Sequence, residues 1–275
     1  MAVFLTPEQI RTFRETIYAY YRAHPRPLPW RETDDPYRIL VSELMLQQTQ
    51  VERVTGKYGE FIRAFPDFRS LAAARLRDVL AVWQGLGYNR RALYLHRIAR
   101  MVASEHGGAL PSDPEVLETF PGIGHATARE IAVFAFRTPA VFIETNIRRV
   151  FIHFFFGEHE RIRDRDILPL VEATLDTGNP REWYYALMDF GVMLKKTVPN
   201  PNVRSAHYHR QSPFHGSTRQ VRGMILRLLT SEPGLDAAVI AERIGKEAES
   251  AVRALRDLVN EGFLIEDEAG GYRVR

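Results

Sequence analysis

The sequence predicts a mostly α-helical protein that ends in a smaller unit of three helices and a β-hairpin. Apolar residues recur at helical spacing through residues 7–106 and again through 113–156, and Gly or Pro residues separate the segments. The composition changes after Gly191, because residues 197–217 are polar and rich in Pro, Asn and His. A new helical pattern begins at Thr218.

Start and stop signals divide the first part of the chain. Thr6, followed by Pro7 and Glu8, predicts the start of a helix. Prolines between residues 25 and 29 end this helix, and a second one restarts near Pro36 with an apolar stripe that continues to Val51. Further helices are expected over about 71–82, 89–105, 113–119, 126–136 and 146–156.

The C-terminal segment has the pattern of a winged helix-turn-helix domain. Apolar residues around Val221, Ile240 and Leu255 predict three short helices. The final residues predict two strands joined by a turn at Gly270 and Gly271. We therefore divide the chain into residues 1–195, a basic loop over 196–216, and a winged helix-like domain over 217–275. Domains of this type bind nucleic acid or make only protein contacts.

Composition excludes several classes of protein. The chain has 275 residues and no cysteine, so disulfides, a thiolate nucleophile and a cysteine-bound iron–sulfur cluster are excluded. No apolar run is long enough to cross a bilayer, and the N-terminus lacks a signal-peptide pattern. We expect a soluble, cytoplasmic protein with no membrane partner.

Basic residues are unevenly distributed, although the net charge is only +3. Residues 84–104 and 190–231 contain no Asp or Glu. The basic residues of these stretches are Arg90, Arg91, Arg97, Arg100, Lys195, Lys196, Arg204, Arg210, Arg219, Arg222 and Arg227. Such clustering favours a polyanionic partner, and the alternative is a solvated surface rich in arginine.

The Pro-Gly-Ile-Gly segment at 121–124 precedes a predicted helix. Glycines at 122 and 124 permit a tight hairpin with positive φ angles. The first turn of the following helix has unpaired N–H groups, which suit a phosphate. This is the pattern of a helix-hairpin-helix, which grips a nucleic-acid backbone without reading bases, although a Gly-rich helix–helix turn needs no ligand.

Two glutamates could perform acid–base chemistry. Glu43 lies in a largely apolar helix, where burial raises a carboxyl pKa, and Glu144 lies at a predicted helix start, which favours the ionised form. One protonated and one ionised carboxyl group are the pair that cleaves glycosidic bonds. Each residue also has a purely structural explanation: Glu43 as a buried glutamate satisfied by a helix terminus, and Glu144 as a capping acid.

Six segments in order resemble one known family. They are LPWR (28–31), DPYRILVSELMLQQTQV (35–51), GLGYNRRALYLHRIA (85–99), FPGIGHATA (120–128), IETNIRRV (143–150) and ALMDFGVM (186–193). Together they resemble the catalytic domain of MutY-type adenine DNA glycosylases, within the helix-hairpin-helix superfamily that includes endonuclease III. The resemblance covers about residues 5–195 and implies two helical lobes with a DNA cleft.

The resemblance also implies roles for individual residues. Glu43 would protonate the flipped purine at N7, and Glu144 would stabilise the cationic sugar or position its water. Gln48 and Tyr88 would enter the base stack near the lesion, and Trp30 and Arg31 would line the base pocket. The residues expected on the DNA backbone are Gly122, Ile123, Gly124, Ala126, Asn146, Arg90 and Arg91. Base flipping is needed because the bond is inaccessible inside the duplex.

The sequence departs from the family pattern at several places. Glu144 replaces an Asp, which moves the carboxylate outward by one methylene. Ala126 occupies the hairpin position where endonuclease III has its Schiff-base lysine, so we expect hydrolysis with the strand left uncut. By the spacing that the resemblance implies, the first three cysteines of the family's iron–sulfur cluster map to Lys195, Asn202 and Ser205, so we expect no cluster. We also expect no MutT-like C-terminal domain, because the winged helix-like domain takes its place.

These departures shape the expected cofactors. Three histidines, at 207, 209 and 215, lie near one another in sequence, and we interpret them as phosphate contacts rather than metal ligands. No metal or other cofactor is expected, except a monovalent cation that the hairpin could hold.

The combined prediction is a monofunctional DNA glycosylase that removes adenine opposite guanine or 8-oxoguanine in base excision repair. One alternative is a glycosylase for thymine, uracil or a modified purine, and another is an inactive DNA-binding protein. The expected partner is double-stranded DNA with a mismatch or lesion. We expect a monomer in the cytoplasm, associated with the nucleoid.

Overall fold

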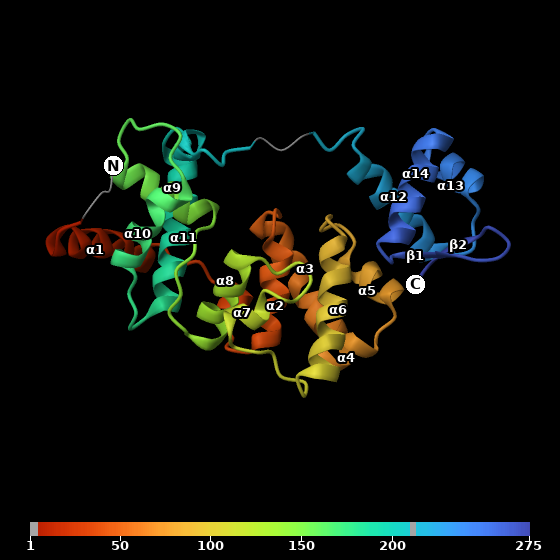
Figure 1. Ribbon diagram of the computed structural model, residues 1–275, viewed down its shortest axis with the longest axis horizontal. Coiled ribbons are helices and arrows are strands. Elements are labelled where there is room, and N and C mark those ends of the chain that lie inside the picture. Colours follow the sequence, from red (N-terminus) through yellow and green to blue (C-terminus); the bar gives the residue numbers. More distant parts are fainter. Residues whose placement is uncertain (1–4, 210–212) are drawn as a thin grey trace. The chain divides into compact units, whose positions relative to one another are not determined.

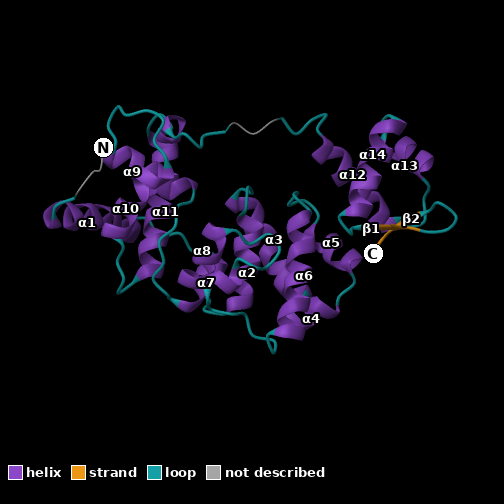
Figure 2. Ribbon diagram, viewed as in Figure 1, coloured by secondary structure: helices purple, strands orange, loops and turns teal. Residues whose placement is uncertain are grey.

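The computed structural model describes residues 5–209 and 213–275, so that Arg210 of the basic stretch lies outside the described residues. The chain forms two compact units that are not consecutive in sequence. Unit 1 contains residues 1–39, 111–119 and 123–210, and unit 2 contains residues 40–110, 120–122 and 211–275. Most of the described residues are helical, as predicted (Figures 1 and 2).

Unit 1 consists of helices around an aromatic core. Its elements are α1 (Pro7–Ala23), η1 (Pro29–Arg31), α7 (Pro114–Leu117), α8 (His125–Phe136), α9 (Thr145–Phe155), α10 (Asp164–Thr174), α11 (Pro180–Thr197) and η2 (Pro201–Arg204). Helix α11 packs against α9 and α1 (Figure 1). The ring of Phe13 lies 5.4 Å from that of Phe151 and 5.8 Å from that of Trp183, and these edge-on contacts fix α1 on the other two helices.

The start of α1 follows the signal in its sequence. Thr6 Oγ1 accepts a hydrogen bond from the Gln9 N–H, and the Gln9 side chain accepts one from the Thr6 N–H. This capping box satisfies N–H groups that the first turn leaves unpaired. The predicted helix start is confirmed.

Helices α9 and α11 approach so closely that only glycine fits at residue 191. A Cβ atom on Gly191 would lie 2.6 Å from the backbone oxygen of Asn146. Gly191 therefore sets the spacing between α11 and the beginning of α9.

Unit 2 contains a helical group and the C-terminal segment. Its elements are α3 (Val51–Ala64), α4 (Phe68–Ala73), α5 (Leu76–Trp83), α6 (Arg90–Glu105), α12 (Thr218–Ser231), α13 (Ala237–Ile244), α14 (Ala248–Asn260), β1 (Leu264–Glu266) and β2 (Tyr272–Val274). Helix α2 (Pro36–Leu46) crosses the boundary between the units after Ile39. Within unit 2, α12 packs against α5.

Two predicted boundaries are wrong. The helix whose apolar stripe is expected to continue to Val51 ends at Leu46. The backbone turns at Gln48, which has a φ of 54°, before α3 begins. The helix expected over 71–82 is broken at Ala74 and Arg75, which are extended. The break allows apolar residues on both sides of it, such as Leu71 and Leu80, to be buried.

The predicted order of the C-terminal elements is confirmed. Three helices are followed by an antiparallel pair, with Leu264 opposite Val274 and Glu266 opposite Tyr272 (Figure 2). Gly270 has a φ of 80°, which suits the turn between the strands. The name winged helix-turn-helix stays our interpretation of this order. Within the described residues, no helix is both long and apolar enough to cross a bilayer.

Candidate active site

The residues predicted to enter the base stack have a strained backbone. Gln48, in the loop between α2 and α3, has a φ of 54°, and Tyr88, in the loop between α5 and α6, has a φ of 47°. A non-glycine residue in this region costs about 1–2 kcal/mol, and such strain persists only where the surrounding structure enforces it. Both residues lie in unit 2.

Arg91 is the residue that enforces these loop conformations. It lies in the first turn of α6, and only 5% of its surface is exposed. Its guanidinium donates hydrogen bonds to two backbone carbonyl oxygens at the end of α2, those of Leu44 (2.9 Å) and Met45 (2.7 Å). It also donates to one carbonyl oxygen in each loop, that of Gln47 (2.6 Å) and that of Gly87 (3.0 Å). Burial lowers the Arg91 pKa to about 10, so the side chain stays charged at neutral pH.

The prediction that Arg91 contacts the DNA backbone is therefore wrong. Its guanidinium is buried, and its hydrogen bonds are made to the protein itself. Arg91 instead ties the Gln48 loop to the Tyr88 loop. The sequence contained a signal for this role, because Arg91 shares a helical face with the buried residues Leu95, Ile98 and Val102.

The neighbouring Arg90 is exposed but paired. Its guanidinium forms a bidentate ion pair with Glu261, at 2.8 and 2.6 Å, and Glu261 also accepts a hydrogen bond of 2.6 Å from Arg222. The hydrogen bond from Arg90 is the main cause that lowers the Glu261 pKa, to about 2. Glu261, which lies outside the stretch 84–104 that contains no Asp or Glu, thus neutralises part of the positive charge of that stretch. A phosphate contact by Arg90 would have to compete with this ion pair.

Glu43 is buried in α2, as its apolar surroundings in the sequence predict. Its relative exposure is 9%, and the flanking residues Ser42 and Leu44 are fully buried. Glu43 belongs to unit 2 and Glu144 to unit 1.

Glu144 is the N-cap of α9. Its Oε1 atom accepts hydrogen bonds from the backbone N–H of Asn146 (2.6 Å) and of Ile147 (2.8 Å), and its Oε2 atom accepts one from the Asn146 side chain (3.2 Å). The additional methylene of Glu, relative to Asp, therefore does not prevent capping. The carboxylate is held at a fixed point at the start of the helix.

The expectation that the helix terminus keeps the Glu144 pKa low is wrong. Burial raises the pKa of this carboxyl, and the N–H donors of Asn146 and Ile147 oppose the rise only in part. Arg149 and Arg148 also lower it, by a smaller amount. Desolvation disfavours the charged form and is the largest of these effects.

Asn146 supports Glu144 rather than projecting into solvent. Its Nδ2 atom donates to Glu144, and its Oδ1 atom accepts a hydrogen bond of 2.7 Å from Arg149. Arg149 is buried and also donates to the Gly191 carbonyl oxygen at 2.8 Å. Both ends of the Asn146 amide are thus engaged within the protein, and the contact of Asn146 with the DNA backbone stays a prediction.

The segment to which the cluster cysteines map is held by hydrogen bonds. Asn202 donates to the Thr145 carbonyl oxygen at 2.9 Å, and Ser205 forms a parallel bridge with Ile162. Asn202 and Ser205 are buried, whereas Lys195 is exposed. Two positions that map to cluster cysteines thus lie in an ordered segment that contacts the start of α9, the helix that carries Glu144.

The predicted hairpin is present with one difference. Gly122 has a φ of 80°, and a Cβ there would collide with the ring of Tyr94, so glycine is required. Gly124 is the N-cap of α8 and has a φ of −96°, so the expectation of a positive φ at this residue is wrong. No side chain caps the helix at Gly124. Ile123 is buried, and Ala126 lies in the first turn of α8.

Trp30 and Arg31 lie in the short helix η1 of unit 1. Trp30 is buried, and Arg31 forms a bidentate ion pair with Asp189 at 2.7 and 2.9 Å. The Arg31 guanidinium also lies 4.4 Å from the centre of the Tyr185 ring. Their place in a base pocket stays a prediction, and the structure adds Asp189 as the residue that fixes Arg31.

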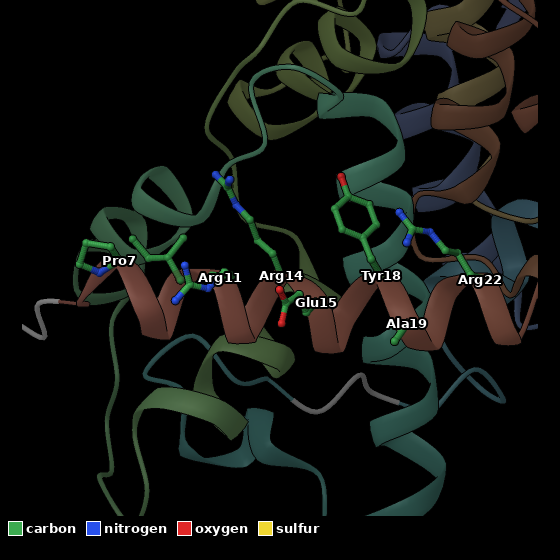
Figure 3. Close-up of a pocket in the computed structure, with 8 residues that line it drawn as sticks. Pro7, Arg11, Arg14, Glu15, Tyr18, Ala19 and Arg22 are labelled. Carbon is green, nitrogen blue, oxygen red and sulfur yellow. The ribbon is translucent and has the colours of Figure 1, made fainter.

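A hollow along α1 contains none of the predicted site residues. Figure 3 shows the residues that line it, among them Arg11, Arg14, Tyr18 and Arg22. Arg14 donates to the Thr174 carbonyl oxygen at 2.9 Å, at the end of α10. Tyr18 donates to Asp176 at 2.7 Å. Arg14 and Tyr18 therefore serve to attach α1 within unit 1.

Comparison with known proteins identifies the family. Residues 41–168 match the model of the HhH-GPD superfamily base excision DNA repair proteins. The adenine DNA glycosylase of Mycobacterium tuberculosis is 36% identical over 93% of this chain and 91% of its own length. That of Mycolicibacterium smegmatis is 35% identical over 93% of each chain. The chain belongs to the adenine DNA glycosylase family.

More distant members and solved structures share the fold. The adenine DNA glycosylase of Homo sapiens is 31% identical over 69% of this chain and 37% of its own length. A thermostable thymine-DNA glycosylase aligns with a TM-score of 0.63 and 28% identity, over 68% of this chain and 87% of that one. A non-covalent endonuclease III–DNA complex, at 21% identity, aligns with a TM-score of 0.54. The alignment covers 77% of this chain and 91% of the endonuclease III chain.

In this member of the adenine DNA glycosylase family, the expected cofactors stay predictions. Among the described residues, no group of three or more His, Cys, Asp or Glu side chains is placed to hold a metal ion. A monovalent cation at the hairpin would use backbone carbonyl oxygens, and that of Gly122 already accepts a hydrogen bond from Gln47 Nε2 at 3.3 Å.

Proposed function

We propose that this chain is a monofunctional DNA glycosylase that excises adenine mispaired with guanine or 8-oxoguanine, as a step of base excision repair. The observation that best supports this is the carboxylate of Glu144, which the start of α9 holds in one place with hydrogen bonds of 2.6 and 2.8 Å. The relatives named adenine DNA glycosylase support the choice of base.

In the proposed reaction, the two carboxyl groups have different tasks. Glu43 gives a proton to N7 of the extrahelical adenine, which makes the base a better leaving group. The Glu144 carboxylate then stabilises the positive charge that develops on the sugar, or orients the water that attacks it. These are the roles that acid and base take in cleavage of a glycosidic bond.

Unit 2 supplies the residues proposed to open the duplex. The hydrogen bonds of Arg91 hold the backbone of both loops, including the strained residues Gln48 and Tyr88, before DNA binds. Residues that enter the stack must compensate for the stacking that the flipped base gives up. We propose that the backbone N–H groups at the start of α8 bind a phosphate of the DNA backbone. The N-cap residue is Gly124, so no capping side chain accepts hydrogen bonds from these N–H groups.

We propose hydrolysis without strand cleavage. Ala126 has no amine with which to attack the sugar, and the chain has only four lysines: Lys57, Lys195, Lys196 and Lys246. Borohydride would trap a covalent adduct if any lysine acted as a Schiff-base nucleophile. A trapped adduct would contradict this part of the proposal.

A second candidate is excision of a different base from a mismatch. The likeness to a thermostable thymine-DNA glycosylase, at 28% identity over 68% of this chain, favours thymine as the base to test. A third candidate is a binding protein without activity, for which a buried acid such as Glu43 has no evident use.

The test is a glycosylase assay on matched and mismatched duplexes, with the released base identified. We expect the wild-type chain to release adenine and Glu43→Gln to release none at a measurable rate. Glu52→Gln is the matched control, because Glu52 is an exposed acid on the adjacent helix α3. Release of thymine would favour the second candidate. Tight binding without release by either chain would favour the third.

A further inference from the structure

The side chain of Tyr88 is held by a residue from the C-terminal segment. Arg219 Nη1 donates a hydrogen bond of 2.6 Å to the Tyr88 hydroxyl, and the Arg219 guanidinium carbon lies 5.6 Å from the centre of the ring. The guanidinium carbon of Arg91 lies 5.4 Å from the same ring. Together with the φ of 47°, these contacts fix both the backbone and the ring of Tyr88.

Arg219 is in turn held by the attachment of its helix. It is the second residue of α12, and α12 packs against α5, the helix that precedes the Tyr88 loop. A separate contact lies at the far end of α12, where Arg77 of α5 donates to the Thr230 carbonyl oxygen at 2.6 Å, and it involves neither Arg219 nor Tyr88. Arg222 reaches Glu261, which also pairs with Arg90 of α6.

We propose that Arg219 is a positioning residue for Tyr88, through which the C-terminal segment increases the preference of the enzyme for mismatched DNA. This inference rests on the proposed function, in which Tyr88 enters the base stack. A tyrosine ring that is already ordered loses less conformational freedom when it enters DNA. Ordering one side chain changes binding by about two- to tenfold.

The chemistry of the contact gives Arg219 a role that lysine cannot fill completely. A guanidinium can donate to the hydroxyl and at the same time stack its plane on the ring, whereas an ammonium is a compact charge. Arg219→Lys should therefore keep the charge that attracts phosphates and lose part of the ring orientation.

The experiment is a double-mutant cycle on the full chain. Wild type, Arg219→Ala, Tyr88→Phe and the double variant are compared by their Kd for a mismatched and a matched duplex at one salt concentration. The Kd for the matched duplex divided by the Kd for the mismatched duplex measures the preference for the mismatch. A general loss of phosphate attraction weakens both complexes equally and cancels in this ratio. We expect each single variant to lower this ratio by about threefold or more and the double variant to lower it no further.

Arg77→Ala is the matched control, because it removes another arginine contact to α12 without touching Tyr88. It should leave the ratio of Kd values unchanged. If Arg77→Ala lowers the ratio as much as Arg219→Ala, the contact only attaches α12, and the inference is overturned. Equal weakening toward both duplexes, or additive effects of Arg219→Ala and Tyr88→Phe, would also overturn it.

The inference and the proposed function can fail separately. The cycle is measured by binding, so it can be read whether or not a base is released. If the wild type releases adenine while the cycle is additive, the function stands and the inference fails. If Glu43→Gln still releases adenine, the proposed chemistry fails irrespective of Arg219.

Discussion

The Arg91 guanidinium donates a hydrogen bond of 2.6 Å to the backbone carbonyl oxygen of Gln47, directly before the strained residue Gln48. The same guanidinium donates to Gly87, directly before Tyr88. One buried side chain thus controls the backbone on the N-terminal side of both residues proposed to enter DNA. This arrangement makes the two loops depend on each other.

Arg91→Lys should destabilise the protein although it preserves the charge. A lysine cannot reach carbonyl oxygens of both loops, so several buried acceptors lose their donor, and we expect the free energy of unfolding to fall by about 3 kcal/mol. Urea denaturation measures this change. Arg100→Lys, at an exposed position of the same helix, should change the stability by less than about 0.5 kcal/mol. Equal effects of the two substitutions would contradict the role assigned to Arg91.

Gln48→Gly should stabilise the fold and weaken recognition. Glycine adopts positive φ without strain, which offsets its greater freedom in the unfolded chain, and we expect a net gain of about 0.5 kcal/mol. The same substitution at Gln84, where φ is −53°, should instead cost about 0.5–1 kcal/mol. Without the Gln48 side chain, the affinity for a mismatched duplex should fall more than that for a matched one. A loss of stability at Gln48 would show that its positive φ is not strained.

Local sequence signals predicted those parts of the fold that depend on neighbouring residues. The helix start at Thr6, the hairpin glycine at 122 and the turn at Gly270 all follow from residues within a few positions of each other. The break between α4 and α5 did not, because it depends on which apolar residues the rest of the unit can bury.

The sequence does not reveal which polar residues of the site are already bonded within the protein. Arg91, Arg90 and Asn146 lie beside recognisable motifs, and the structure bonds them to Gln47, Glu261 and Glu144, respectively. Burial removes Arg91 from the DNA contacts, whereas the contacts of Arg90 and Asn146 with DNA stay predictions. Such partners are invisible to an argument that counts charges along the chain. The pKa of Glu144 was misjudged for a related reason, since its burial depends on tertiary packing.

Stability should depend on pH through Glu144. Its carboxyl pKa is raised in the folded state, so folding favours the protonated form. The contribution of the Glu144 carboxyl to the free energy of unfolding is fully present below the unfolded-state pKa of about 4.3. This contribution is lost as pH rises through the higher folded-state pKa. Relative to Glu144→Gln, the wild type should therefore become less stable over this range. Urea unfolding of both chains at several pH values measures the difference. A wild type that gains stability relative to Glu144→Gln over that range would contradict the raised pKa.

Glu144→Asp should preserve activity, whereas Glu144→Gln should not. Aspartate is a preferred N-cap residue, so it can keep the hydrogen bonds to Asn146 and Ile147, and we expect stability within about 1 kcal/mol of wild type. It also keeps the negative charge proposed to stabilise the sugar cation. Single-turnover excision should stay within about tenfold for Asp and fall by about 10² or more for Gln. Equal activity of the Asp and Gln variants would remove Glu144 from the mechanism.

Gly191→Ala should disturb Glu144 from the opposite helix. The new Cβ would lie 2.6 Å from the backbone oxygen of Asn146, so α11 must move away from the start of α9, at a cost of about 1–3 kcal/mol. Because Arg149 also donates to the Gly191 carbonyl oxygen, the shift loosens the support of Asn146 and so of the Glu144 carboxylate. We therefore expect a lower excision rate even at temperatures where the variant is fully folded. Gly223→Ala is the control, because Gly223 lies inside α12 with no atom within 4 Å of a new Cβ, and there alanine should stabilise by up to about 1 kcal/mol. A Gly191→Ala variant with unchanged excision would show that the position of Glu144 does not depend on the spacing between α9 and α11.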